Sequence, residues 1–304
     1  MGTPDFAATS LEQLINSNHD VVAVVTGVDK KKGRGMKVHV TPVKQKAEEH
    51  HLPILQPESL KDESFRKQLE EYKPDIFVVV AFKILPKKII SIPKFGSINL
   101  HSSLLPKYRG AAPINWAILN GDKETGITIF QIEPKVDTGD ILAQKKIDIN
   151  KMDTFKHIYD KLSVIGSECL VETLDKMKLG IMTKIKQKDE LASIAPKIIP
   201  EMGIIDWKKP AQKIKNQIHG LSPIPGAYSH FNKKRIKILR ACFTSENSDS
   251  EPGTIVIRNK NKLGIQTGIG ILFPLELQKE GKKAVPIKAL LNGFQGQIGD
   301  KFTS

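Results

Sequence analysis

The feature that most constrains this chain is the alternation of short apolar runs with helical stretches over its first 180 or so residues. Runs rich in β-branched residues occur at 21–26, 75–82 and 96–103, and the second, DIFVVVAF, is apolar almost throughout. A strand of that kind is buried on both faces, as the strands of parallel sheets are. Strand–helix alternation favours right-handed βαβ units. The sequence therefore predicts an α/β domain with a doubly wound, Rossmann-like sheet.

Helix signals lie between and after these runs. Thr41 is a good N-cap because its hydroxyl can accept a backbone N–H of the first turn. Pro42 suits the first helical position because its nitrogen needs no hydrogen-bond partner there. Ser59 stands before apolar residues at helical spacing and is expected to cap a second helix. A continuous apolar stripe predicts a long helix near 153–177.

The pattern changes in a polar, proline-bearing stretch at 185–204, which is expected to be a linker between a catalytic domain at 1–184 and a C-terminal domain at 205–304. A helix is expected near 210–220. Short alternating runs follow, and their spacing indicates a small antiparallel barrel, of which the oligonucleotide-binding (OB) barrel is one example. The predicted strands of this barrel are 235–243, 253–259, 262–268 and 270–278.

The positive charge of the chain is unevenly distributed. The net charge is +14, and residues 207–304 alone carry 17 Lys and Arg against 6 Asp and Glu, a net of +11. Clustered basic side chains gain affinity for polyanions by releasing condensed counterions. Compositional bias toward lysine is the alternative, but it does not explain the scarcity of acidic residues in one third. The charge therefore favours a nucleic-acid partner.

Other features of the sequence exclude some locations and sites. No apolar run reaches the ~18–20 residues that cross a bilayer, and the N-terminus lacks the pattern of a signal peptide. Cys169 and Cys242 are far apart and have no metal-ligand spacing. We expect a monomer in the cytoplasm, or in an organellar matrix in a eukaryote, with no membrane contact and no metal.

The segment at 97–121 carries the clearest chemical signal. Asn99 and His101 stand two apart at the carboxyl end of a predicted strand, so both side chains project from one face. Ligands of open α/β sheets bind at such strand ends. An amide can donate to a developing oxyanion and an imidazole can exchange a proton near neutral pH. The alternative is that Asn99 and His101 are structural residues whose polar groups are hydrogen-bonded inside the protein.

Two motifs here resemble the signatures of the folate-dependent formyltransferases. LHSSLLPKYRGAAPINWAILNGDKETGITI (100–129) resembles the first and KVDTGDIL (135–142) the second. Segments at 2–7, 26–44 and 194–227 are similar to those members of the family that act on an aminoacyl-tRNA, and the resemblance covers essentially the whole chain.

The resemblance implies a reaction. The α-amine of methionine on charged initiator tRNA would attack the formyl carbon of 10-formyltetrahydrofolate. It assigns catalytic roles to Asn99 and His101, which would stabilise the formyl oxygen, and to Asp137, which would orient the imidazole and raise its basicity. Leu104 and Leu105 would line an apolar slot for the pterin. The full set expected at the folate site is Ser103, Leu104, Leu105, Pro106 and Gly139.

The basic loop at 29–37 is expected to contact the acceptor end of the tRNA. Arg34 between Gly33 and Gly35 aligns with the central arginine of the resembled loop, while Val28 and Lys31 replace prolines that are common there. The further basic residues expected to bind tRNA are Lys32, Lys37, Lys208, Lys209, Lys233, Lys234 and Arg235.

Two alternatives remain beside this reaction. Formyltransferases that act on a nucleotide-linked amino sugar share the catalytic motif and a related C-terminal barrel. A non-enzymatic RNA-binding relic is the other, because GTPDFA follows the first β-strand in the resembled family and Met1 stands where the last residue of that strand belongs. A first strand is therefore expected to be missing.

Overall fold

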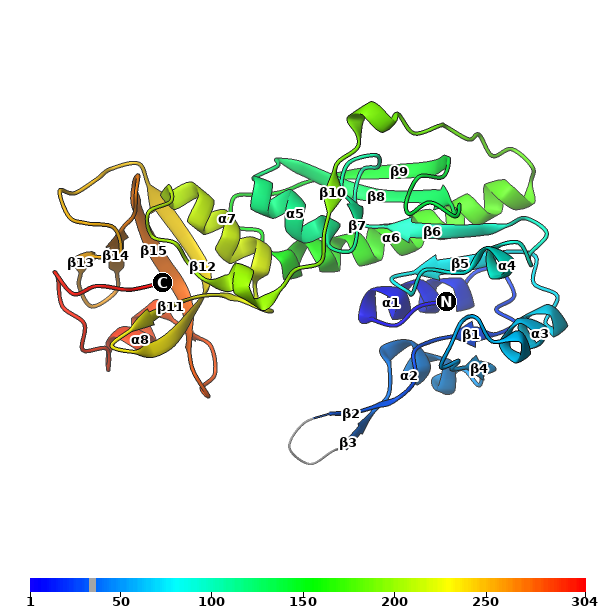
Figure 1. Ribbon diagram of the computed structural model, residues 1–304, viewed down its shortest axis with the longest axis horizontal. Coiled ribbons are helices and arrows are strands. Elements are labelled where there is room, and N and C mark those ends of the chain that lie inside the picture. The colour runs from blue at the N-terminus through cyan, green and yellow to red at the C-terminus, as the bar shows by residue number, and fades with distance from the viewer. Residues whose placement is uncertain (33–36) are drawn as a thin grey trace. The chain divides into compact units, whose positions relative to one another are not determined.

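The computed structural model describes residues 1–32 and 37–304, which form two compact units (Figure 1). Each unit is built from three separate stretches of the chain, so the path leaves and re-enters both. The first unit holds residues 1–110, 125–147 and 159–195; the second holds residues 111–124, 148–158 and 196–304.

The main sheet of the first unit has the strand order β5-β6-β8-β9. β5 and β6 are parallel, with Val79 opposite Asn99, whereas β6 and β8 are antiparallel, with His101 opposite Thr128. The predicted α/β class of this unit is therefore confirmed, and its sheet is mixed, with one antiparallel neighbour beside the parallel pair. Apolar patterning reports the burial of a strand but not its direction, which depends on the path of the connection. The strands are β5 (Phe77–Val80), β6 (Ser97–His101), β8 (Glu124–Gln131) and β9 (Ile141–Asp148).

Three two-stranded sheets and five α-helices complete the described part of this unit, and one of these sheets pairs Arg109–Gly110 with Ile194–Ala195. A parallel pair joins β1 (Val24–Val25) to β4 (Ile54–Leu55), and an antiparallel pair joins β2 (Lys30–Lys32) to β3 (Lys37–His39). The helices are α1 (Asp5–Ile15), α2 (Pro42–Glu49), α3 (Glu63–Glu71), α4 (Lys87–Ile90) and α6 (Phe155–Lys178), of which the last belongs to this unit from Tyr159 onward.

One predicted cap is confirmed and the other is wrong. The Thr41 hydroxyl accepts a hydrogen bond from the Lys44 N–H at 3.0 Å at the start of α2. α3 begins four residues beyond Ser59 and its N-cap position is Asp62. The Ser59 hydroxyl instead accepts the N–H of Lys61, a local turn that competes with helix formation.

The first two residues lie between β1 and β5. The backbone nitrogen of Met1 donates to the Val78 carbonyl at 2.7 Å, and that of Gly2 donates to the Val25 carbonyl at 3.0 Å. A cavity of about 470 Å³ opens beside them. The structure does not confirm the expected loss of a first strand, which stays a prediction. Apolar side chains that line the cavity include Leu11, Val43, Leu69 and Phe77.

The second unit contains an antiparallel sheet with the order β11-β12-β15-β14-β13, and β16 pairs with β15. No pairing between β11 and β13 closes it into a barrel in the part of the chain that the structure describes. Bridges join Thr303 to His230 of β11 and Lys301 to Thr254 beside β13. The strands are β11 (Ala227–Phe231), β12 (Lys234–Thr244), β13 (Ile255–Arg258), β14 (Leu263–Gln266), β15 (Ile271–Lys279) and β16 (Val285–Pro286).

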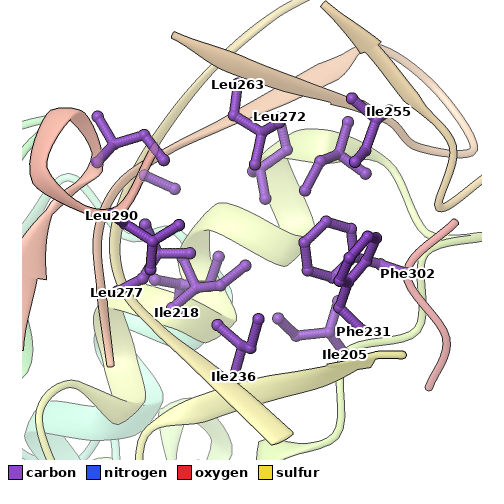
Figure 2. Close-up of a cluster of buried hydrophobic side chains, with 14 of the residues drawn as sticks. Ile205, Ile218, Phe231, Ile236, Ile255, Leu263, Leu272, Leu277, Leu290 and Phe302 are labelled. Atoms are coloured by element: carbon purple, nitrogen blue, oxygen red, sulfur yellow. The ribbon is translucent and has the colours of Figure 1, made fainter. Parts of the chain in front are cut away.

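An apolar core fills the concave side of this sheet (Figure 2). Phe231 packs against Phe294 and Phe302, with ring centroids 4.8 and 4.9 Å apart. The buried Trp207 indole donates to the Ser229 hydroxyl at 3.0 Å, which satisfies its only polar atom. Isoleucine and leucine side chains from the sheet and from two helices, α7 (Ala211–Leu221) and α8 (Ile287–Leu291), fill the rest.

An early helix of the chain packs in this later unit. In α5 (Pro113–Asn120), the Asn115 amide donates to the Gly220 carbonyl of α7 at 2.7 Å. A Cβ added to Gly220 would lie 3.0 Å from Leu119, so glycine permits the two helices to approach closely.

His219 of α7 is a fully buried imidazole in this unit. Its Nε2 lies 3.0 Å from the Ala241 carbonyl oxygen and 3.2 Å from the Ala241 backbone nitrogen of β12, so it can donate to the first or accept from the second. Burial lowers the pKa of His219 from 6.5 to about 4, and the ammonium of Lys215 adds to the shift.

We predict that acid destabilises the second unit through His219. The ring is neutral in the fold, whereas in the unfolded chain it binds a proton below pH 6.5, so the free energy of unfolding decreases as pH falls from 6.5 toward 4. The loss reaches about 3 kcal/mol at the acid end. Urea unfolding at several pH values measures it. His219→Gln is expected to flatten this dependence, whereas the same substitution at exposed His39 leaves it; equal slopes in both variants would contradict the assignment.

Candidate active site

β6 presents Asn99 and His101 on one face of the main sheet, as the sequence predicts. His101 is buried, with 7% of its surface exposed, and the Phe130 ring of β8 packs edge-on against the imidazole at 6.3 Å. Asn99 is only partly buried. Its side-chain amide has no hydrogen-bond partner within the described ranges, so it is available to a ligand.

A backbone carbonyl holds the imidazole. His101 Nε2 lies 2.9 Å from the Tyr108 carbonyl oxygen, which can only accept, so Nε2 carries a proton. Asp137 Oδ2 lies 3.9 Å from His101 Nδ1, beyond hydrogen-bond distance but close enough for charge attraction. The same oxygen accepts the Gly110 N–H at 2.8 Å. The imidazole, the Tyr108 carbonyl and the Asp137 carboxylate form a cluster in which the carboxylate lies beside Nδ1, the ring nitrogen that can accept a proton.

The residues around the imidazole adopt left-handed backbone conformations. The φ angles of Tyr108, Gly110 and Asp137 are 63°, 118° and 53°. A non-glycine residue in this region costs about 1 kcal/mol or more, so surrounding contacts must hold Tyr108 and Asp137. The conformation directs the Tyr108 carbonyl and the Asp137 carboxylate to opposite nitrogens of one ring.

The Thr128 hydroxyl organises the neighbouring loop at 103–106. It donates to the Ser103 carbonyl at 2.7 Å and accepts both the Leu105 N–H at 3.0 Å and the Gln144 amide at 2.9 Å. Gln144 also donates to the Leu105 carbonyl at 2.8 Å. The backbone groups of Leu105 therefore have partners inside the protein.

The residues expected at the folate site differ in their access to a ligand. Leu104 and Pro106 are partly buried, whereas Leu105 is packed into a cluster with Phe130 and Ile141. Ser103 is fully buried and donates its hydroxyl proton to the Lys107 carbonyl at 2.7 Å. Gly139 is pressed against the backbone of Gln131, where a Cβ has no room. The site assignments stay predictions.

A segment expected to be part of the linker packs against the candidate site. Residues 185–195, called here the strap, belong to the first unit, and residues 196–204 belong to the second. Within the strap, β10 (Ile194–Ala195) pairs in parallel with β7 (Arg109–Gly110). The Ser193 hydroxyl accepts the Tyr108 N–H at 2.9 Å. Polar composition gave no sign of these contacts.

The predicted tRNA-binding residues lie in several places. Arg34 is outside the described residues, and Lys32 and Lys37 are backbone partners in the β2–β3 pair. Lys208 and Lys209 are exposed in the turn before α7. In the β11–β12 hairpin, the exposed Lys233 and Lys234 stand at or beside the turn. Beyond them, the Arg235 guanidinium lies 3.7 Å from the centroid of the Tyr228 ring.

Two negative findings apply to residues 1–32 and 37–304. No group of three His, Cys, Asp or Glu side chains there is arranged to hold a metal ion. No helix in the same ranges is long and apolar enough to cross a membrane.

Comparison with known proteins identifies the class of this fold and site. Residues 1–174 match the formyl transferase family, and residues 197–295 match the formyl transferase C-terminal domain. The chain belongs to the formyl transferase family. Within this family, the chain is grouped with the methionyl-tRNA formyltransferases by its sequence identity to them.

The similarity to curated relatives runs nearly end to end. The methionyl-tRNA formyltransferase of Caldanaerobacter subterraneus is 48% identical over 295 residues, covering 96% of this chain and 95% of its own. The methionyl-tRNA formyltransferase of Geobacter metallireducens is 44% identical over 300 residues, covering 98% and 96%. Among solved structures, the sugar 3N-formyl transferase WlaRD, determined with dTDP and 5-N-formyl-THF, shares the fold at a TM-score of 0.67 and 22% identity, covering 93% of this chain and 97% of that one.

We predict that Thr128→Val destabilises the first unit by about 2–3 kcal/mol, because the isosteric methyl removes the partner of the buried Leu105 N–H, of the Ser103 carbonyl and of one hydrogen of the partly buried Gln144 amide. Thermal or urea unfolding measures the loss. Thr9→Val is the matched control, since the Thr9 hydroxyl bonds only its own helix at the surface. A Thr128→Val protein as stable as the control would show that the hydroxyl does not organise the loop.

Proposed function

We propose that this protein transfers the formyl group of 10-formyltetrahydrofolate to the α-amino group of methionine on charged initiator tRNA. The observation that carries the proposal is the cluster of Asn99, His101 and Asp137 at the end of β6. The near full-length similarity to methionyl-tRNA formyltransferases supports the substrate.

The reaction moves one proton from the amine to the leaving nitrogen, in two transfers, and passes through one charged intermediate. The neutral amine attacks the formyl carbon, and a carbon–nitrogen bond forms while negative charge develops on the formyl oxygen. The bond from the formyl carbon to folate N10 then breaks, and the proton lost by the amine is delivered to N10. No external oxidant or reductant takes part.

His101 is the proposed proton carrier. Its Nε2 proton is engaged by the Tyr108 carbonyl, which leaves Nδ1 to accept the proton of the amine. The imidazolium formed in this way is stabilised by the Asp137 carboxylate 3.9 Å away. Nδ1–H is then the acid that protonates the leaving nitrogen.

Asn99 is the proposed oxyanion donor. It lies on the same face of β6 as His101, and its side-chain amide has no partner within the described ranges. A donor fixed by a strand costs no reorganisation when charge develops, which is the condition for effective transition-state stabilisation. The predicted folate residues Ser103, Leu104, Leu105 and Pro106 follow the end of the same strand, and Gly139 lies between β8 and β9.

The second unit is the proposed tRNA-binding part. Residues 207–304 carry a net charge of +11, and its β11–β12 hairpin turn presents exposed lysines to solvent. The residues proposed to bind tRNA phosphates, or bases in the case of arginine, are Lys32, Arg34, Lys37, Lys208, Lys209, Lys233, Lys234 and Arg235. We further propose that the unit is an OB-like barrel, because the segment at 299–303 bonds to both β11 and β13.

The alternatives have less support. A nucleotide-linked amino sugar is a small substrate that needs no basic second unit, and the sugar formyl transferase matched here shares only the fold. The relic hypothesis does not explain why three chemically matched groups are assembled around His101.

A direct comparison of substrates tests the proposal. Purified protein is incubated with 10-formyltetrahydrofolate and either methionine-charged initiator tRNA or a dTDP-linked amino sugar. We expect formyl transfer to the tRNA alone. Transfer only to the sugar, or to neither acceptor, would overturn the proposed function.

We predict that Asn99→Ala lowers kcat for formyl transfer about 10²–10³-fold with little change in the KM values, because the lost donor acts on charge present only in the transition state. Steady-state kinetics measure the effect. Asn261→Ala, at an exposed asparagine of the second unit, is the control expected to retain activity. A raised KM with an unchanged kcat in Asn99→Ala would mean that the amide binds the substrate in the ground state and does not stabilise the transition state.

We predict that replacing both Lys233 and Lys234 with Ala raises the KM for tRNA and leaves the KM for the formyl donor unchanged. The slope of log affinity against log salt is expected to shrink by about 1–2, since two phosphate contacts are lost. Binding titrations at several salt concentrations measure it. The control replaces the exposed Lys87 and Lys88 of α4 with Ala, which removes the same charge. An equal effect there would mean that tRNA affinity depends on the net charge of the protein and not on the hairpin lysines.

A further inference from the structure

The strap contains one side chain that joins both loops around His101. We propose that Gln187 is a positioning residue that holds Asp137 at the imidazole, an inference that rests on the proposed function. The Gln187 amide nitrogen donates to the carbonyl oxygens of Asp137 at 3.0 Å and Gly139 at 2.8 Å. Its amide oxygen accepts from Arg109 Nε at 3.1 Å and Nη2 at 2.8 Å.

These four contacts fix the orientation of the amide. The guanidinium of Arg109 only donates, and the two carbonyls only accept. A rotated amide would place its NH₂ against the guanidinium and its oxygen against two carbonyl oxygens. One orientation therefore satisfies all four hydrogen bonds, and only a side chain with both a donor and an acceptor can make them.

Besides Gln187, the loop that carries Asp137 is held by the Gly110 N–H on the Asp137 carboxylate and by a local bond from the Thr138 hydroxyl to the Lys135 carbonyl. Residues 133–136 are exposed, and Val136 leaves 47% of its surface in solvent, so apolar packing contributes little there. Asp137 adopts a φ of 53°, which is unfavourable for a residue with a Cβ. Gln187 bonds the carbonyl of this strained residue directly, and the carbonyl two residues later.

The other end of the bridge is already anchored. The backbone of Arg109 pairs with the strap, its N–H donates to the Ser193 carbonyl at 2.8 Å, and its guanidinium also binds Asp189 at 2.7 Å. Arg109 directly follows Tyr108, whose carbonyl holds His101 Nε2. Gln187 thus ties the segment that fixes one imidazole nitrogen to the loop whose carboxylate faces the other.

The isosteric variant Gln187→Glu is the sharpest test. A carboxylate keeps the volume and strengthens the contact with Arg109, but it cannot donate to the carbonyls of Asp137 and Gly139 and repels both oxygens. We expect kcat for formyl transfer to methionyl-tRNA to fall about 10–100-fold, with both KM values within about threefold of the wild type. Thermal unfolding is expected to show an intact fold.

Two further variants separate positioning from stability. Asp189→Asn weakens the second contact of the same guanidinium on the same strap and is expected to keep kcat within about twofold, because the Asp189 carboxylate contacts the side chains of Arg109 and Lys135 and bonds neither Asp137 nor Gly139. The double variant Gln187→Glu, Asp137→Asn tests the route of the effect. If Gln187 acts through the Asp137 carboxylate, the Glu substitution costs less than about twofold once that carboxylate is gone.

The outcomes distinguish this inference from the proposed function. A wild-type protein that does not formylate methionyl-tRNA overturns the function itself. An active wild type with Gln187→Glu within twofold of it overturns only the role of Gln187. An equal loss from Gln187→Glu with and without the Asp137 carboxylate also overturns it, because the effect would then be structural.

Discussion

The parallel pairing of β7 with β10 is the constraint on which the candidate active site depends. It is only two residues long, yet it fixes Arg109 and Gly110 against Ile194 and Ala195. Gly110 has a φ of 118°, and a Cβ at this position would lie 2.9 Å from the Ala195 carbonyl oxygen. The approach of the two backbones therefore requires glycine at this place. Gly110, whose N–H binds the Asp137 carboxylate, lies in this pairing, and Tyr108, whose carbonyl binds the imidazole, comes directly before it.

The division of hydrogen bonds around His101 has a chemical meaning. A neutral carbonyl orients the ring, and a backbone N–H orients Asp137. The carboxylate is therefore not used to hold the imidazole in place. Its negative charge lies 3.9 Å from Nδ1 and attracts the imidazolium that protonation of the ring would form. In the proposed mechanism, orientation and charge stabilisation come from different groups, so the ring gains and loses a proton without losing its position.

Local patterns in the sequence predicted the local features of the structure. The period-two placement of Asn99 and His101 gave their shared face, and the Thr41–Pro42 pair gave the start of α2, because both depend on neighbouring residues. The family resemblance, and not the pattern, pointed to Asp137. Its proximity to His101 in the fold agrees with that assignment, while its role stays a proposal.

Contacts between distant residues were beyond these patterns. Gln187 bonds a residue 50 positions earlier, and polar composition in its surroundings is typical of a solvated linker. The direction of β8 and the internal partners of Leu105 depend in the same way on where the chain returns. The resemblance supplied residue identities at the site, and only the structure supplied the carbonyl of Tyr108 and the strap that holds it.

The interleaving of the two units affects how the chain can fold during synthesis. α5 belongs to the second unit, but most of that unit, including α7, lies at residues 196–304. At a ribosomal rate of roughly 5–20 residues per second, on the order of 5–18 s pass between the synthesis of the end of α5 and that of the start of its partner α7. During that time the apolar face of α5 is exposed to chaperones and to other nascent chains. The first unit is likewise incomplete until the strap has left the ribosome, so neither unit can fold as a purely N-terminal or C-terminal module.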